Sequence, residues 1–307
     1  MDPRPWSARD VLLLGLTISA WGANYLFVRI GLESAAPIWL AALRAGTGLV
    51  ALAVYFTLVP PGARLGRSER VTALLLGIPN TALFLGLWFT AAGSVPAGEA
   101  AVVIYTYPLW VAVLSIPVLR ARLNPMHWGS IAAGFAGILL VSEPWAASGG
   151  KTPLLPVVEL LAAAVSWATA TVVVQRRFRP EEMAAVNGYQ LLGGAAVLVV
   201  VALALDPRHL PVSTPSLWIS VVWLGVFGTA FAYAVWFQLL GKVPAATLSA
   251  YAFLVPLVAL GASAAFLGER LDLAQGAGVA LVVGSIYGVS RAGIRRTRTR
   301  PTANDPG

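Results

Sequence analysis

The chain has 307 residues, of which 58% are hydrophobic and only 11% are charged. A soluble domain carries about 25% charged residues because its surface must meet water, so this composition excludes an ordinary soluble protein and predicts an integral membrane protein. The net charge of +8 would suit a nucleic-acid binder, but the basic residues fall between apolar runs. Membrane topology explains them better, and we expect no nucleic-acid partner.

Ten apolar stretches follow one another, and a helix over each could cross a hydrocarbon layer of about 30 Å. The first follows Arg4 and Arg9 and is too long for the core of a signal peptide, so we predict an uncleaved helix. The fifth is short and marginal on its own. In chain order the predicted spans are 11–30, 37–58, 71–92, 97–119, 127–141, 155–174, 184–205, 216–240, 245–267 and 271–290.

Lysine and arginine residues gather on one side of this predicted topology. If the N-terminus is cytoplasmic, 16 of the 21 lie in cytoplasmic segments and 4 lie outside, while Arg44 lies within the second span. Such a bias sets the orientation of membrane proteins. We therefore predict a multi-pass protein of the cytoplasmic cell membrane, in contact with the lipid bilayer, with both termini in the cytoplasm and a basic cytoplasmic tail over residues 292–307.

The second half of the chain repeats the first. A shift of 148 residues overlays 74–142 on 222–290 without a gap, with about 20 identities in about 69 positions. A shift of 146 residues relates earlier positions of the two halves. The pairs include Gly77 with Gly225, Thr81 with Thr229, Trp88 with Trp236 and Pro108 with Pro256, and at the second shift Trp21 with Trp167 and Arg44 with Gln190.

Each copy holds five predicted spans, which is an odd number, so the second copy should enter the membrane upside down. Inverted repeats of this kind are typical of secondary transporters. The predicted fold is therefore an all-α integral membrane protein of ten transmembrane helices, arranged as two inverted five-helix repeats over residues 1–150 and 151–291.

Two stretches carry a family resemblance. Residues 93–114 read GSVPAGEAAVVIYTYPLWVAVL, and residues 227–271 read FGTAFAYAVWFQLLGKVPAATLSAYAFLVPLVALGASAAFLGERL. They resemble the first and second repeats of the EamA-like branch of the drug/metabolite transporter superfamily. The resemblance covers 11–290 and implies the ten-helix fold and, commonly, export of amino acids, other metabolites or drug-like compounds. The LGER motif with Glu269 is replaced in the first copy by LRAR, which lacks the glutamate.

Polar and aromatic side chains at membrane depth are the candidate binding residues. Arg44 lies about 10 Å into its span at 1.5 Å per residue, where an arginine usually faces a partner or a water-filled cavity. Glu99 and Glu159 are possible partners, and both a substrate-carboxylate site and a structural pair or snorkelling remain open. Amides and rings could orient a ligand or simply pack between helices. The candidates are Asn24, Tyr25, Arg44, Asn80, Trp88, Tyr105, Tyr107, Trp167, Gln190, Tyr233, Trp236 and Tyr251.

Prolines and small residues predict how the helices bend and pack. Pro108 and Pro256 occupy matching positions, and each removes a backbone hydrogen bond, so we interpret them as a pair of hinges, with static kinks as the alternative. Small residues at every fourth position of the fifth and tenth spans predict close packing within the chain or across a dimer, so a monomer and a homodimer both remain open. They are Gly129, Ala133 and Gly137, and Gly276, Ala280, Gly284 and Gly288.

The chain has no cysteine and only two histidines, far apart, so we expect no metal and no cofactor. It has no phosphate-binding loop and no catalytic triad, which argues against an enzyme. We therefore expect a secondary transporter that exports small organic metabolites, amino acids or drug-like amphiphiles, by alternating access. A metabolite importer or exchanger and a non-transporting membrane scaffold are the alternatives, and the sequence leaves substrate, direction and ion coupling open.

Overall fold

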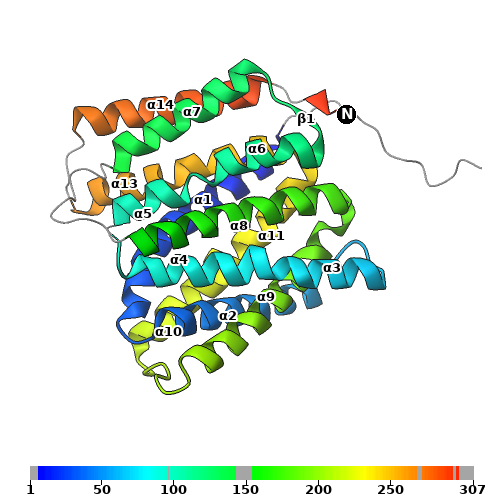
Figure 1. The fold of residues 1–307 in the computed structure, drawn as a ribbon, viewed down its shortest axis with the longest axis vertical. Helices are drawn as coiled ribbons and strands as arrows, with labels where there is room; N and C mark the ends of the chain where they lie inside the picture. Colours follow the sequence, from blue (N-terminus) through cyan, green and yellow to red (C-terminus); the bar gives the residue numbers. More distant parts are fainter. Residues whose placement is uncertain (1–5, 96, 143–153, 268–271, 293–294, 297–307) are drawn as a thin grey trace, which may run out of the picture.

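The computed structural model describes residues 6–95, 97–142, 154–267, 272–292 and 295–296. Its long helices run roughly side by side across the molecule (Figure 1). Within the described residues, nine helical stretches are long and apolar enough to span a membrane, and Ala245–Gly261 is a shorter apolar helix. The predicted all-α membrane architecture is thus confirmed. Glu269 and residues 297–307 of the predicted tail lie outside the described part.

The helix ends lie within a few residues of the predicted ends in most cases, and the fifth predicted span forms a full 18-residue helix. In the first half the elements are α1 (Ala8–Leu32), α2 (Pro37–Leu58), α3 (Arg67–Gly77), η1 (Ile78–Leu83), α4 (Phe84–Ala92), α5 (Ala97–Ile104), α6 (Tyr107–Leu119), β1 (Ala121–Arg122) and α7 (Pro125–Ser142). In the second half they are α8 (Leu154–Arg177), η2 (Pro180–Glu182), α9 (Met183–Leu205), α10 (Pro215–Val222), η3 (Trp223–Phe231), α11 (Ala232–Lys242), α12 (Ala245–Ala250), η4 (Tyr251–Phe253), α13 (Leu254–Leu267), α14 (Leu273–Ala292) and β2 (Arg295–Arg296).

The third and eighth predicted spans each contain a π-helical segment, η1 and η3. The shift of 148 residues places η1 within η3, so the two halves share this irregularity. Pro79 lies in η1, but η3 contains no proline, so proline does not explain both segments. A hydrophobic run predicts a membrane-spanning helix, but it does not show whether the backbone bonds join residues four or five positions apart. The sequence therefore did not predict these π-helical segments.

The fourth and ninth predicted spans are both interrupted near the prolines that the sequence analysis interprets as hinges or kinks. The first breaks between α5 and α6, and Pro108 is the second residue of α6. The other passes through the short 3₁₀ segment η4, and Pro256 follows at the third residue of α13. Proline cannot bond to the carbonyl four residues before it, so each break lies where that bond is lost.

Two helix crossings that bring the halves together are very close. A methyl group on Gly77 would lie 2.1 Å from the Gln190 carbonyl oxygen, and one on Gly225 would lie 2.6 Å from Thr47 Cβ. Only glycine therefore fits at these crossings. Gly77 and Gly225 are repeat-related, so the contact of η1 and α3 with α9 has its counterpart in the contact of η3 with α2.

Helices α7 and α14 lie side by side at one edge of the molecule (Figure 1). A methyl group on Gly137 would lie 2.7 Å from the carbonyl oxygen of Gly278, so small residues allow this close approach. The predicted small-residue rows are only partly used, because Gly129, Gly276 and Gly284 have no neighbouring atom within 4 Å of the added group. The short antiparallel pair β1–β2 joins the ends of α6 and α14.

Candidate functional site

An internal cavity lies where the helices of the two halves meet, and its volume is about 50 Å³. A buried water needs about 10–15 Å³, so this is room for a few waters and less than a metabolite requires. The wall comes from α1, α2, α4, α5, α6, α8 and α11. It comprises Trp21, Asn24, Tyr25, Arg44, Phe84, Trp88, Ile104, Tyr105, Tyr107, Trp167 and Tyr233.

Eight of the twelve predicted binding residues line this cavity. Three lining residues, Trp21, Phe84 and Ile104, were not predicted to bind. The repeat could have identified Trp21, because it pairs with Trp167, whereas Phe84 and Ile104 carry no sequence signal that separates them from ordinary apolar helix residues.

Arg44 is the charged residue of the cavity wall, and only 1% of its surface is exposed. Its Nε donates to Thr229 Oγ1 over 2.9 Å, and its Nη2 donates to the Gly228 carbonyl oxygen over 3.1 Å. The guanidinium also lies over the rings of Trp88 and Phe89, at 5.5 Å from each centroid. Its Nη1 is buried and has no hydrogen-bond partner among the described residues.

The carbonyl oxygen of Gly228 that accepts from Arg44 belongs to the π-helical segment η3. Such irregular segments often occur at functional sites. Trp21 Nε1 donates to the same oxygen over 3.1 Å. The irregular segment of the second half therefore anchors two cavity residues of the first half.

Aromatic rings form most of the remaining wall. The repeat-related Trp21 and Trp167 contact each other edge to face, with centroids 6.2 Å apart. The ring centroid of Trp167 lies 5.2 Å from that of Tyr233 and 4.8 Å from that of Phe84. The rings of Tyr25 and Trp88 also contact each other, with centroids 5.7 Å apart. Rings of this kind offer an apolar body a close fit while their polar tips can orient it.

Four predicted binding residues lie elsewhere. Asn80 Nδ2 donates to Gln190 Oε1 over 2.9 Å in a separate buried cluster with Thr81 and Asn187. The side-chain amides of Asn80 and Gln190 bond within this cluster, and neither residue lines the cavity.

The other two are aromatic. Trp236 packs behind Trp21 at 5.1 Å, and Tyr251 packs on Trp6 at 5.1 Å.

Of the two predicted acidic partners of Arg44, only Glu159 has a described side chain, and it is not in contact with Arg44. Among the described residues Arg44 makes no ion pair, and Glu159 is not among its hydrogen-bond partners. The side chain of Glu99 lies outside the described part. The described surroundings of Arg44 are therefore hydroxyl, carbonyl and aromatic groups.

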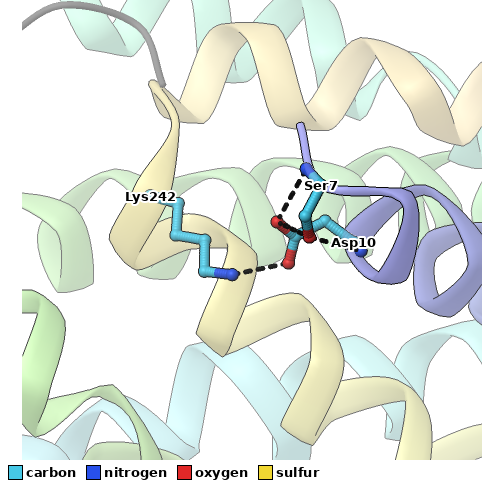
Figure 2. A network of polar contacts seen from close by, with 3 residues as sticks. All are labelled: Ser7, Asp10 and Lys242. Atoms are coloured by element: carbon cyan, nitrogen blue, oxygen red, sulfur yellow. Dashed lines mark hydrogen bonds and ion pairs between the residues drawn. The ribbon is translucent and has the colours of Figure 1, made fainter. Parts of the chain in front are cut away.

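The end of the molecule near the start of α1 is held by an ion pair. Lys242, the last residue of α11, contacts Asp10 Oδ1 over 2.5 Å (Figure 2). Ser7 Oγ donates to the other carboxylate oxygen of Asp10 over 2.8 Å. At 1.5 Å per residue, Asp10 lies about 20 Å along α1 from Asn24, so this first-half to second-half contact is well separated from the cavity.

The opposite end is held by contacts between the loop after α1 and the loop before α10. Val212 N donates to the Ser34 carbonyl oxygen over 2.8 Å, and the Ser34 and Thr214 hydroxyl oxygens lie 3.0 Å apart. Trp39 Nε1 donates to the Asp206 carbonyl oxygen over 2.9 Å. Both ends of the molecule thus carry polar contacts between the two halves.

A multi-pass helical protein with a polar and aromatic cavity between its halves has the architecture of a membrane transporter. The comparison with protein families is consistent with this: the model of the EamA-like transporter family matches residues 9–143 and again residues 155–291. The chain belongs to the EamA-like transporter family.

Its relatives are named as transporters or as an efflux pump. The chain is 29% identical to an uncharacterized transporter, YvbV, of Bacillus subtilis over 91% of this chain and 90% of that one. It is 28% identical to a probable amino-acid metabolite efflux pump of Salmonella typhimurium over 95% of this chain and 98% of that one. It is 27% identical to the uncharacterized inner membrane transporter YedA of Escherichia coli K12 over 86% of this chain and 84% of that one. A crystal structure with 22% identity has the same fold, with a TM-score of 0.76 over 92% of this chain and 98% of that one.

Proposed function

We propose that this protein exports small organic metabolites across the cytoplasmic membrane by alternating access. Its ten spans form two inverted repeats, residues 1–150 and 151–291, with both termini in the cytoplasm. The observation that carries the proposal is the cavity lined from both halves, with polar contacts between the halves towards each end of the molecule. If one set of contacts parts while the other holds, the cavity opens to one side at a time.

The matched contacts of the two halves support the inverted repeat. Arg44 on α2 bonds to Thr229 in η3, and the repeat-related Gln190 on α9 bonds to Thr81 in η1. Because the two repeats are similar, the form of the protein that opens inward and the form that opens outward pack in similar ways and have similar free energies. Similar free energies are the condition for exchange between the two forms.

The breaks at Pro108 and Pro256 are the proposed hinges. Each lies at a junction of two short helices, where few backbone bonds must change for the segments to rotate. Their matching positions in the two copies assign one hinge to each gate. The pocket residues Tyr105 and Tyr107 flank the first break, so its movement would change the cavity directly.

The relative named as a probable amino-acid metabolite efflux pump favours export and amino-acid-related substrates. Import or exchange uses the same architecture and differs only in which gradient drives the cycle. A scaffold without transport is disfavoured, because a buried arginine facing a cavity is costly and has no role in a passive bundle.

Flux through purified protein in proteoliposomes tests the proposal. Vesicles are loaded with a panel of labelled amino acids, organic acids and amphiphilic amines, and efflux and uptake are followed with and without a pH gradient. We expect saturable flux of at least one compound above empty vesicles. No flux of any compound in either direction would favour the scaffold, and flux only with an imposed proton gradient would identify proton coupling.

A further inference from the structure

We propose that the cavity binds an organic monoanion whose carboxylate is held by Arg44 Nη1, and that it selects against cations. This inference rests on the proposed transport function and names the substrate class of the same site. It starts from the arrangement of charge around the cavity.

The cavity carries one uncompensated positive charge. Arg44 is 1% exposed, none of the described lining residues is acidic, and no described acidic group pairs with the guanidinium. A charge buried without a partner is expensive, and rings at 5.5 Å offset only part of the cost. A bound anion would supply the missing partner.

The contacts that Arg44 already makes fix the direction in which it can bind. Nε and Nη2 are used by Thr229 and Gly228 of η3, so these bonds hold the planar group in place. Nη1, with two N–H groups, has no acceptor among the described residues. A purely structural arginine would have its donors satisfied by the fold, whereas this cavity-lining arginine keeps one nitrogen unpaired.

Other described polar groups of the wall also lack partners, and several of them can donate a hydrogen bond. Trp88 Nε1 and the Tyr233 hydroxyl are buried without hydrogen-bond partners among the described residues, and both residues line the cavity together with Arg44. One carboxylate oxygen at Nη1 and the other near Tyr233 would satisfy these groups together. Asn24 Oδ1 and the Tyr25 hydroxyl can accept, but neither carries a negative charge, so no described group of the wall can neutralise an ammonium group.

The rest of the wall determines the body of the ligand. Trp21, Trp167, Phe84 and Ile104 present apolar surface beside the guanidinium. An apolar body therefore suits the wall next to the carboxylate, and a ring-sized ligand requires the cavity to widen beyond its present volume of about 50 Å³. With a monoanion bound, the buried site is neutral overall; a zwitterion would bring an ammonium that has no carboxylate to meet, and a cation would be repelled.

Phenylacetate, phenylacetamide, phenethylamine and phenylalanine test this assignment, because they share one ring and differ in charge. Binding to the purified full-length protein is measured by quenching of its tryptophan fluorescence and by the shift in thermal unfolding. We expect phenylacetate to bind about tenfold or more tightly than the amide and the amine, and more tightly than phenylalanine, as expected for a buried charge-assisted contact. Equal affinity for the amide or the amine, or tighter binding of phenylalanine, would overturn the inference.

The substitution Arg44→Gln removes the positive charge. Glutamine is also the residue at the repeat-related position, Gln190. We expect it to lose the preference for phenylacetate over phenylacetamide. Arg29→Gln, the same change at an exposed position on α1, is the matched control and should keep the preference. An Arg44→Gln protein that folds and still prefers the anion would refute the role of Arg44.

Tyr233→Phe keeps the inference falsifiable if Arg44→Gln does not fold. It removes one unpaired oxygen, so thermal stability should be unchanged or higher while phenylacetate binding weakens several-fold. Unchanged phenylacetate binding would overturn the proposed carboxylate geometry. The flux measurements test transport independently of charge preference. Flux without a preference for anions would reject this inference alone. Absence of flux for every compound would reject the proposed function.

Discussion

Arg44 and Thr229 join the second helix of one half to the π-helical segment of the other, with 2.9 Å between Nε and Oγ1. The repeat-related pair, Gln190 and Thr81, makes the corresponding contact with 2.8 Å between Oγ1 and Oε1. The same helix crossing thus occurs twice. In one copy the guanidinium of Arg44 lines the cavity, and in the other the amide of Gln190 lies outside the cavity wall. This is one difference between the two halves, and the first predictions concern it.

Replacing Arg44 with alanine should abolish most transport while leaving folded protein. The change removes the cavity charge together with two contacts to η3, so we also expect a lower unfolding temperature. Flux in proteoliposomes and thermal unfolding in detergent measure the two effects. Unchanged transport kinetics would remove Arg44 from the mechanism.

Replacing Thr229 with valine should destabilise the protein by about 1–3 kcal/mol, because it leaves a buried charged donor without its acceptor. Thr81→Val should cost less, since Gln190 Oε1 keeps its bond from Asn80. Thr90→Val is the matched control, because the Thr90 hydroxyl bonds only within its own helix, to Gly86. Thermal unfolding of the three variants checks the order, and a Thr229→Val protein as stable as the Thr90→Val protein would contradict it.

Alanine at Gly77 or Gly225 should destabilise the protein by about 1–3 kcal/mol or prevent folding, because the added methyl would overlap the neighbouring helix. Gly15→Ala on α1 is the control: no atom lies within 4 Å of the added methyl, and alanine is the better helix former. We expect that variant to be as stable as the original protein or slightly more so. Expression level and unfolding temperature are the measurements, and tolerance of both crossing substitutions would show that the helices are not in close contact.

Breaking the Asp10–Lys242 ion pair should favour opening of the cavity towards the start of α1. The chain has no cysteine, so one introduced at Ile104 in the cavity wall gives a clean labelling site. We expect Asp10→Asn to raise the rate of its modification by a membrane-impermeant maleimide from that side. The exchanged pair Asp10→Lys with Lys242→Asp should restore the slower rate. Equal labelling in all three proteins would exclude the ion pair as a gate contact.

Replacing Pro108 or Pro256 with alanine should slow transport several-fold with little loss of stability, because alanine lets the two short helices join and stiffens the hinge. Pro37→Ala, at the first turn of α2, is the control, because proline there interrupts no bond. Initial flux rates at saturating substrate are compared. Flux at the original rate in both hinge variants would leave the prolines as static features of the fold.

Much of the candidate site could be predicted because buried polar residues in lipid-facing segments are costly and therefore informative. Arg44, Asn24 and Tyr233 were identified in this way, and the structure brings them to one cavity. Asn80 and Gln190 met the same criterion, but their side chains satisfy each other in a separate cluster. Sequence alone does not distinguish a polar group that faces a ligand from one that faces another side chain.

The sequence by itself determined that this chain is a helical membrane protein, because a long apolar run in lipid must satisfy its backbone bonds within a helix. It also determined the internal repeat and, through it, which positions correspond. Only the tertiary structure decided which segments are π-helical, which polar side chains meet at the cavity, and that Arg44 Nη1 has no partner among the described residues. These features depend on which helices cross and how closely, and such contacts join residues nearly 200 positions apart that no local pattern relates.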